Sequence, residues 1–283
     1  MASRWEGGRV DLNTVSSYRA ARSREDLRLA PGERILGGGT WLYSEPQVTT
    51  TGLVDLTSMG WPAIEYPDGG GLRIGATCTI AELSKLPERE GWRAHPLFFQ
   101  AATALLASFK IWNVATVGGN VCQSFSAGSM TSLCAALDAT ALIWTPDGTD
   151  YTVPVADLMT GNSTNNLADG EVLRWIDIPE HALRAHTGFR KIALAELGRS
   201  GAVLTGRVDE DGSAVFSITA ATLTPNVLRY PILPSAARLQ ADSDAAVGYY
   251  DDPLGTADWR RGVSGVLLEE IRSELAVAEE VPR

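Results

Sequence analysis

Asn113–Asp138, with the sequence NVATVGGNVCQSFSAGSMTSLCAALD, is the stretch around which the chain is organised. Its centre, Thr116–Asn120 (TVGGN), places two adjacent glycines between a helix-like apolar segment and a polar turn of small residues. Glycine lets the backbone approach a ligand closely or adopt a positive φ angle. The pattern is therefore typical of a loop that binds a diphosphate.

A second glycine-rich stretch, Ile35–Thr40 (ILGGGT), has the same design: a short apolar strand, then glycines, then a hydroxyl residue. Two such loops can close on one ligand from opposite sides. Neither loop fits the Walker pattern, which ends in Lys-Ser or Lys-Thr, or the Rossmann GxGxxG pattern. Taken alone, each loop is more often a tight turn in an α+β protein than a phosphate site.

Composition narrows the classes of ligand and partner. The chain has 283 residues, enough for two domains or one large domain with a real core. Its formal net charge of −10 and pI of about 4.8 argue against nucleic acid or an anionic membrane as a partner, because both require basic surfaces. We therefore expect a diphosphate to be held mainly by backbone amides, which glycine loops supply.

The three cysteines, Cys78, Cys122 and Cys134, follow no CxxC or His-containing spacing. The sequence therefore predicts neither a disulfide framework nor a zinc or iron–sulfur site, and small buried thiols are expected instead. The first 15 residues contain no apolar leader segment, and no run approaches the roughly 18 apolar residues of a membrane span. We expect a cytoplasmic protein.

Apolar spacing and turn residues predict the secondary structure of the first half. The strand Gly52–Leu56 is expected to return beside Ile35–Leu36 and to form a small βαβ-like unit. Thr79–Glu82 fits a capping box that opens a short helix after the strand Gly71–Ala76. Apolar positions from Phe98 to Phe109 recur at helical spacing, which predicts one helix leading into the central loop.

The second half continues the α+β pattern. Polar residues 179–187 are predicted to be a domain linker, and the final helix carries a stripe that is either core or partner-facing, with core favoured. The stripe comprises Val263, Leu267, Ile271 and Leu275. The other predicted elements are a helix at Ser129–Ala139, strands at Thr140–Trp144, Tyr151–Val155 and Glu171–Ile178, and a hairpin of Ala202–Val208 with Ala214–Ala221.

Five motifs occur in an order that spans most of the chain. They are ILGGGT (35–40), NVATVGGN (113–120), LCAALDATAL (133–142), GEVL (170–173) before a strand ending in Pro179, and DPLGTADWRR (252–261). In these motifs the chain resembles the FAD-binding (medium) subunits of the molybdenum hydroxylases, such as carbon monoxide dehydrogenase and bacterial xanthine dehydrogenases. Trp112, where the family often has arginine, and Leu194 and Ala195, where a basic pair often follows, depart from that pattern.

The resemblance implies an α+β fold and a division into domains. A two-subdomain FAD-binding domain of the PCMH/vanillyl-alcohol-oxidase type would cover residues 1–180, with subdomains at about 1–57 and 58–180. A small α+β C-terminal domain of the molybdenum hydroxylase flavoprotein type would cover residues 181–283.

The resemblance also implies the cofactor and its site. FAD would be bound non-covalently, because neither glycine loop contains a histidine to tether it. Ser129 stands where the family usually has an aspartate that contacts FAD hydroxyls, Leu173 would pack against the isoalloxazine, and Lys191 matches a family lysine near the flavin. No catalytic side chain and no metal ligand is expected. The remaining implied binding residues are Leu36, Gly37, Gly38, Gly39, Thr40, Trp41, Thr116, Val117, Gly118, Gly119 and Asn120.

The function implied by the resemblance is electron transfer. A small partner subunit would pass electrons from its [2Fe–2S] clusters to FAD, and a large molybdopterin-binding subunit would oxidise the substrate, in a dimer of heterotrimers. The external acceptor would be NAD⁺, a quinone, oxygen or another compound. Two alternatives stay open: a self-sufficient FAD oxidase or dehydrogenase, and a non-redox assembly subunit with the same fold.

Overall fold

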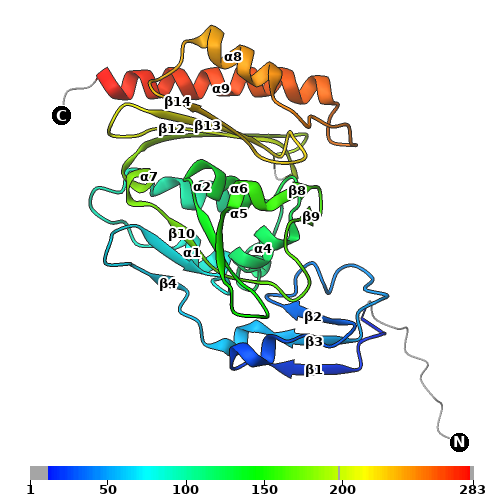
Figure 1. The fold of residues 1–283 in the computed structure, drawn as a ribbon. Coiled ribbons are helices and arrows are strands. Elements are labelled where there is room, and N and C mark those ends of the chain that lie inside the picture. Colours follow the sequence, from blue (N-terminus) through cyan, green and yellow to red (C-terminus); the bar gives the residue numbers. More distant parts are fainter. Residues whose placement is uncertain (1–11, 197, 281–283) are drawn as a thin grey trace, which may run out of the picture.

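The computed structural model describes residues 12–196 and 198–280 and arranges them in three successive layers (Figure 1). A small parallel sheet lies at one end, a five-stranded sheet with helices in the middle, and a four-stranded sheet covered by two helices at the other end. This architecture confirms the predicted α+β class. The sequence predicts no apolar leader segment in the first 15 residues. Residues 1–11 of that stretch lie outside the described residues.

The first sheet has the strand order β1 (Ser17–Ala20), β3 (Gly52–Asp55), β2 (Glu33–Leu36), and both of its strand pairs are parallel. The predicted pairing of residues 35–36 with residues 52–56 is confirmed. The connection over residues 37–51 is described throughout and contains turns but no helix, so the predicted βαβ-like unit lacks its helix. The 3-10 helices η1 (Arg24–Leu27) and η2 (Leu56–Met59) complete this layer.

The middle sheet is antiparallel and forms the second layer. Its order is β4 (Ile64–Glu65), β5 (Leu72–Gly75), β10 (Val172–Ile178), β6 (Thr140–Trp144), β7 (Tyr151–Pro154). A bulge interrupts β10 between Leu173 and Trp175. Beside the sheet, Thr79 and Glu82 make the predicted capping box at the start of α1 (Ile80–Ser84).

Helices α2 (Pro96–Ala104) and α5 (Ser129–Ala136) pack between the middle and the C-terminal sheets (Figure 1). Leu97, Phe98 and Leu133 are fully buried in this core. The other elements of the layer are α3 (Phe109–Trp112), α4 (Val117–Gln123), α6 (Val155–Leu158), β8 (Met159–Gly161) and β9 (Thr164–Asn165).

The single helix predicted from Phe98 to Phe109 is wrong, because α2 ends at Ala104 and α3 is separate. The last carbonyl groups of α2 are bound by distant side chains: the Ser200 hydroxyl donates to Ala104 at 3.1 Å and the Lys191 ammonium to Thr103 at 3.4 Å. These contacts satisfy carbonyl groups that a longer helix would use internally. Helical spacing alone does not reveal them.

The C-terminal sheet is an antiparallel meander of β11 (His186–Ala193), β12 (Ser200–Val208), β13 (Ala214–Thr219) and β14 (Asn226–Tyr230). The predicted hairpin corresponds to β12 and β13. Helices α8 (Ala236–Ala245) and α9 (Ala257–Glu280) cover the sheet. Ile271 and Leu275 of α9 are buried in its core and Val263 and Leu267 are partly buried, which confirms the core interpretation of the stripe.

Residues 179–187 are not an exposed linker, and this prediction is corrected. They include α7 (Glu180–Arg184), whose Ala182 and Leu183 are fully buried in the core of the middle layer. Only two of its five residues are apolar, so composition suggested a loop. The division into residues 1–180 and 181–283 stays a prediction.

A buried arginine joins the middle and C-terminal layers. Arg207 of β12 donates to the Ala136 carbonyl at the end of α5 at 2.6 Å and forms ion pairs with Asp138 and Asp209. Burial alone would raise the pKa of Asp138, but hydrogen bonds from Arg229 and Arg207 outweigh burial and lower it. The carboxylate of Asp138 therefore stays charged between two guanidinium groups.

Candidate functional site

A cavity of about 760 Å³ lies between the first sheet and the middle layer. This volume is within the usual range for small-molecule sites. Both glycine-rich segments contribute to its wall, although they are separated by more than 70 residues in the sequence. Predicted site residues on the wall are Leu36, Gly37, Gly38, Gly39, Thr40, Trp41, Thr116, Gly118, Gly119, Asn120 and Leu173.

The two glycine segments meet backbone to backbone. A Cβ atom added at Gly38 would lie 1.7 Å from the carbonyl oxygen of Val114 and 3.1 Å from the Cα of Ala115. Contacts shorter than about 3 Å to main-chain atoms leave no room for a side chain. Gly38 is thus required for the close approach that brings the two segments to one cavity.

The first segment has unpaired backbone N–H groups at residues that line the cavity. Within the described residues, the N–H groups of Gly38, Gly39 and Thr40 donate to no other protein group. Gly39 has a φ of 69°, so the backbone turns through the left-handed region at this point. Successive N–H groups in such a turn form a concave site for an anion.

The second segment is the first turn of helix α4, not a loop. Its N–H groups are already paired: Val117 donates to the Cys78 carbonyl at 2.8 Å and Gly118 to the Ala76 carbonyl at 3.0 Å. Gly119 donates to the Oγ1 atom of Thr116, which caps the helix. The second segment therefore contributes side chains and a main chain that the first segment can approach closely. The N–H groups without a protein partner belong to the first segment.

Three predicted residues do not line the cavity. Val117 is fully buried beneath it, and Lys191 lies on β11 with its ammonium group on the Thr103 carbonyl. Ser129 is also fully buried, and its Oγ atom has no hydrogen-bond partner among the described residues. Asn120, by contrast, lies on the wall and accepts a hydrogen bond from the Met130 N–H at 2.9 Å, which fixes the start of α5.

Sequence reasoning missed several wall residues. Arg34 is the one cationic side chain on the described wall, and it is exposed with no ion pair to the described chain. Its neighbour Glu33 is bound by Arg19 at 2.8 Å, which lowers the pKa of Glu33 to about 2 and keeps it charged. Arg34 lies in β2, directly before the residues Ile35 and Leu36 that lead into the first glycine segment, and this position is the signal that could have identified it.

The wall also has an apolar part. Trp41 and Phe125 contact each other edge to face, with ring centroids 6.1 Å apart, and Leu173 is 3% exposed. Burial raises the pKa of the Cys122 thiol to about 12, so this wall residue is not a thiolate nucleophile. Within residues 12–196 and 198–280, no group of His, Cys, Asp and Glu side chains is placed to hold a metal ion.

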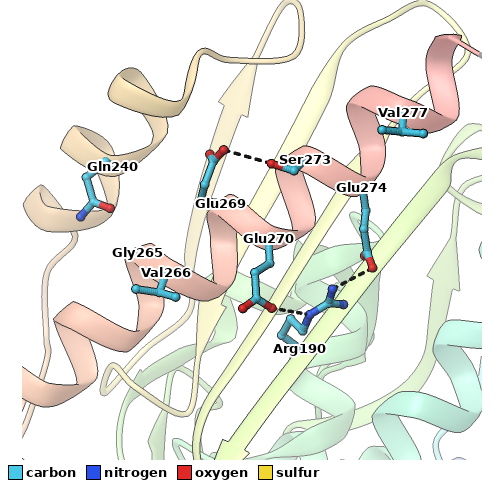
Figure 2. A pocket seen from close by; sticks show the side chains of 9 residues that line it. All are labelled: Arg190, Gln240, Gly265, Val266, Glu269, Glu270, Ser273, Glu274 and Val277. Carbon is cyan, nitrogen blue, oxygen red and sulfur yellow. Dashed lines mark hydrogen bonds and ion pairs between the residues drawn. The ribbon is translucent and has the colours of Figure 1, made fainter.

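A second hollow lies on the outer face of the C-terminal layer, between α8, α9 and β11 (Figure 2). Figure 2 shows Arg190 between Glu270 and Glu274. Its guanidinium forms ion pairs with the two carboxylates, at 2.9 Å to Glu270 and 2.7 Å to Glu274. The guanidinium of Arg190 and the two carboxylates are thus already paired with one another. The hollow also lies in a different layer from the two glycine segments. The first cavity is therefore the candidate site.

Comparisons with known proteins identify a family and several relatives of the chain. The chain matches the family described as "FAD binding domain in molybdopterin dehydrogenase" over residues 13–181, more than half of its length. It is 25% identical over 226 residues to the xanthine dehydrogenase FAD-binding subunit of Escherichia coli O157:H7, covering 76% of each protein.

No helix in the described part of the chain has the length and hydrophobicity needed to cross a bilayer.

Solved structures share the fold over nearly the whole chain. Quinoline 2-oxidoreductase from Pseudomonas putida 86 superposes with a TM-score of 0.79 at 22% identity, covering 93% of this chain and 97% of the other. CO dehydrogenase from Oligotropha carboxidovorans gives a TM-score of 0.78 at 21% identity, covering 91% and 96%. At identities of 22% and 21%, the structural similarity shows a shared fold.

Proposed function

The chain belongs to the family of FAD-binding domains of molybdopterin dehydrogenases, and on this premise we propose that it is the electron-transfer subunit of a molybdenum hydroxylase. FAD is its cofactor and it is part of an oxidoreductase. In the proposed assembly, electrons reach this chain from [2Fe–2S] clusters of a small subunit and leave to an external acceptor. A large molybdopterin-binding subunit oxidises the substrate, and the assembly is a cytoplasmic dimer of heterotrimers.

The single observation that carries the proposal is the meeting of the two glycine segments at one cavity with open amide donors. A diphosphate fits the N–H groups of Gly38, Gly39 and Thr40, with the charge of Arg34 beside it. Leu173 offers an apolar surface for a flat ring. FAD bound there supplies the redox chemistry, and the chain supplies its position, its charge environment and its shielding from water.

The alternatives have less support. A self-sufficient oxidase needs a base beside the flavin, yet the described wall carries no His or Tyr, and its Glu33 is held in an ion pair. Asp169 is exposed, and Glu171 accepts hydrogen bonds from Tyr151 and from a backbone amide. The intact cavity and the open amides argue against an assembly subunit that has lost its cofactor.

The purified chain is expected to show flavin absorption bands at about 370 and 450 nm, and acid precipitation is expected to release the flavin into the supernatant. This result follows from non-covalent binding between the two glycine segments. A colourless chain that also fails to bind added FAD would overturn the proposed function. Flavin that stays in the acid precipitate would replace dissociable FAD by a covalent link.

Replacing Arg34 with glutamine is expected to raise the Kd for FAD about fivefold, equivalent to about 1 kcal/mol, because an exposed charge beside the diphosphate is lost. The difference should shrink as salt is added, since salt screens exposed charges. Fluorescence titration of FAD at low and high salt measures it. Arg28→Gln, an exposed arginine that does not line the cavity, is the control. Equal affinities of the two variants would contradict a diphosphate beside Arg34.

A further inference from the structure

Arg174 of β10 is a buried arginine without a polar partner in the described chain. It is 9% exposed, and its Nε and Nη1 atoms are buried without a hydrogen bond or an ion pair to any described residue. The other two buried arginines of the described chain, Arg207 and Arg260, each pair with a carboxylate and with backbone carbonyls. An unsatisfied buried charge costs free energy, so its presence calls for an explanation.

A bulge and three tryptophans fix the position of this arginine. Leu173 and Trp175 pair with consecutive residues of β6, so Arg174 is the extra residue of the bulge in β10. Bulges often re-aim a side chain beside a functional site. The guanidinium lies 4.2 Å from the ring centroid of Trp61, 4.9 Å from that of Trp175 and 5.4 Å from that of Trp144. Aromatic faces stabilise a cation that has been removed from water.

The tryptophan cluster adjoins the wall of the FAD cavity. Trp61 and Trp144 pack against a group of buried apolar residues that includes Leu56 and Val172, and both of these line the cavity. Arg174 itself does not line the cavity, although Leu173, the residue before it, does. Its charge therefore acts on the cavity through an apolar wall, where water and salt screen it only weakly.

The charge of Arg174 is not neutralised by its surroundings. Burial lowers the pKa of its guanidinium, but the pKa of arginine is so high that the group stays charged. Glu65 attracts it without forming an ion pair, and Arg73 repels it. Arg73 is itself paired with Asp177 at 2.7 Å. Arg174 is thus a positive charge without a bound counter-charge among the described residues.

We propose that Arg174 raises the reduction potential of FAD bound in the cavity. The inference rests on the proposed function and adds a residue that tunes the cofactor without touching it. Two electrons from the iron–sulfur donor and one proton from water turn the neutral flavin ring into an anion, which a nearby cation stabilises. At an effective dielectric constant of about 20, a unit charge about 10 Å away changes such an equilibrium about tenfold.

Replacing Arg174 with methionine tests the proposal, because methionine keeps an unbranched side chain and removes the charge. The purified FAD-loaded chain is reduced with dithionite beside a dye of known potential. Arg174→Lys retains the charge, and Arg73→Met is the matched control, since it removes an arginine that lies 3.9 Å from the Trp175 ring but is paired. Arg174→Gln, which is also neutral, replaces the methionine variant if the latter does not fold.

We expect the neutral variant to lower the equilibrium constant for two-electron reduction of bound FAD about tenfold, a fall of about 30 mV in potential. Arg174→Lys and Arg73→Met should stay within twofold of the wild type. By linkage, the neutral variant should lose about tenfold more affinity for reduced FAD than for oxidised FAD, which fluorescence and absorbance titrations measure.

Urea unfolding of the FAD-free variants separates this role from a purely structural one. A neutral variant that is less stable but keeps the wild-type potential would show that Arg174 only packs the tryptophans, and would overturn the proposal. A lysine variant whose potential falls as far as that of the methionine variant would also overturn it, because the charge would not be the cause. A wild-type chain that binds no FAD would instead overturn the proposed function, and this inference with it.

Discussion

Replacing Gly38 with alanine is expected to abolish FAD binding and to lower the free energy of unfolding by about 3 kcal/mol, the upper end of the usual cost of overpacking. The new Cβ would lie 1.7 Å from the carbonyl oxygen and 2.6 Å from the carbonyl carbon of Val114. Both are main-chain atoms, so no side-chain rotation relieves the contact. The two glycine segments must separate, and the cavity between them opens.

The measurement combines urea unfolding of the FAD-free chain with a fluorescence titration of FAD. Gly69→Ala is the matched control, because a Cβ atom at Gly69 meets nothing within 4 Å. The control should keep wild-type affinity and change stability by less than about 1 kcal/mol. If Gly38→Ala bound FAD as tightly as the control, the close approach of the two segments would not be needed for the site.

The site was partly predictable, because the requirement for glycine is local. Adjacent glycines before Thr40 and after Thr116 were recognisable in the sequence, and the structure brings them together. The sequence does not reveal which backbone N–H groups of the two segments lack a protein partner. The N–H groups of Val117 and Gly118 are taken by carbonyl groups of Cys78 and Ala76, and such pairing depends on the tertiary fold.

Roles carried over from a resemblance met a similar limit. Ser129 and Lys191 are predicted from the resemblance to lie near the flavin. In the structure Ser129 is buried, Lys191 contacts the end of α2, and neither lines the cavity, so their roles stay predictions. Position in a motif specifies where the backbone runs, and the partner of a side chain depends on residues far away in sequence. Ala182 and Leu183 illustrate the same point for the fold. Their segment is polar in composition, yet it forms the helix α7 and these two side chains are buried.

The motif over residues 252–261 acquires a physical explanation only from the structure. Its Arg260 is fully buried, although arginine is usually exposed. The guanidinium donates to the carbonyls of Gly201 and Ala220, forms an ion pair with Asp252 at 2.5 Å and lies 4.1 Å from the ring of Tyr250. One side chain thereby joins the start of α9 to β12 and to the residue that follows β13.

Replacing Arg260 with methionine is expected to cost about 3 to 5 kcal/mol of stability, because the buried carbonyl groups and Asp252 lose the donor that compensates their burial. Arg261→Met is the control one residue away: its ion pair is with Asp258, whose side chain is 95% exposed, and should be worth less than about 1 kcal/mol. Urea unfolding measures both.

The same variant separates stability from cofactor binding. No contact of Arg260 reaches the cavity wall, so the folded fraction of Arg260→Met should bind FAD within about threefold of the wild-type affinity at a temperature well below its Tm. A large loss of affinity in the folded variant would show that the C-terminal layer influences the cavity. The route for such coupling exists in α2, whose last carbonyl group is bound by Ser200 of β12. Because Gly201, whose carbonyl accepts from Arg260, directly follows Ser200, a shift of this strand is the first structural change to look for.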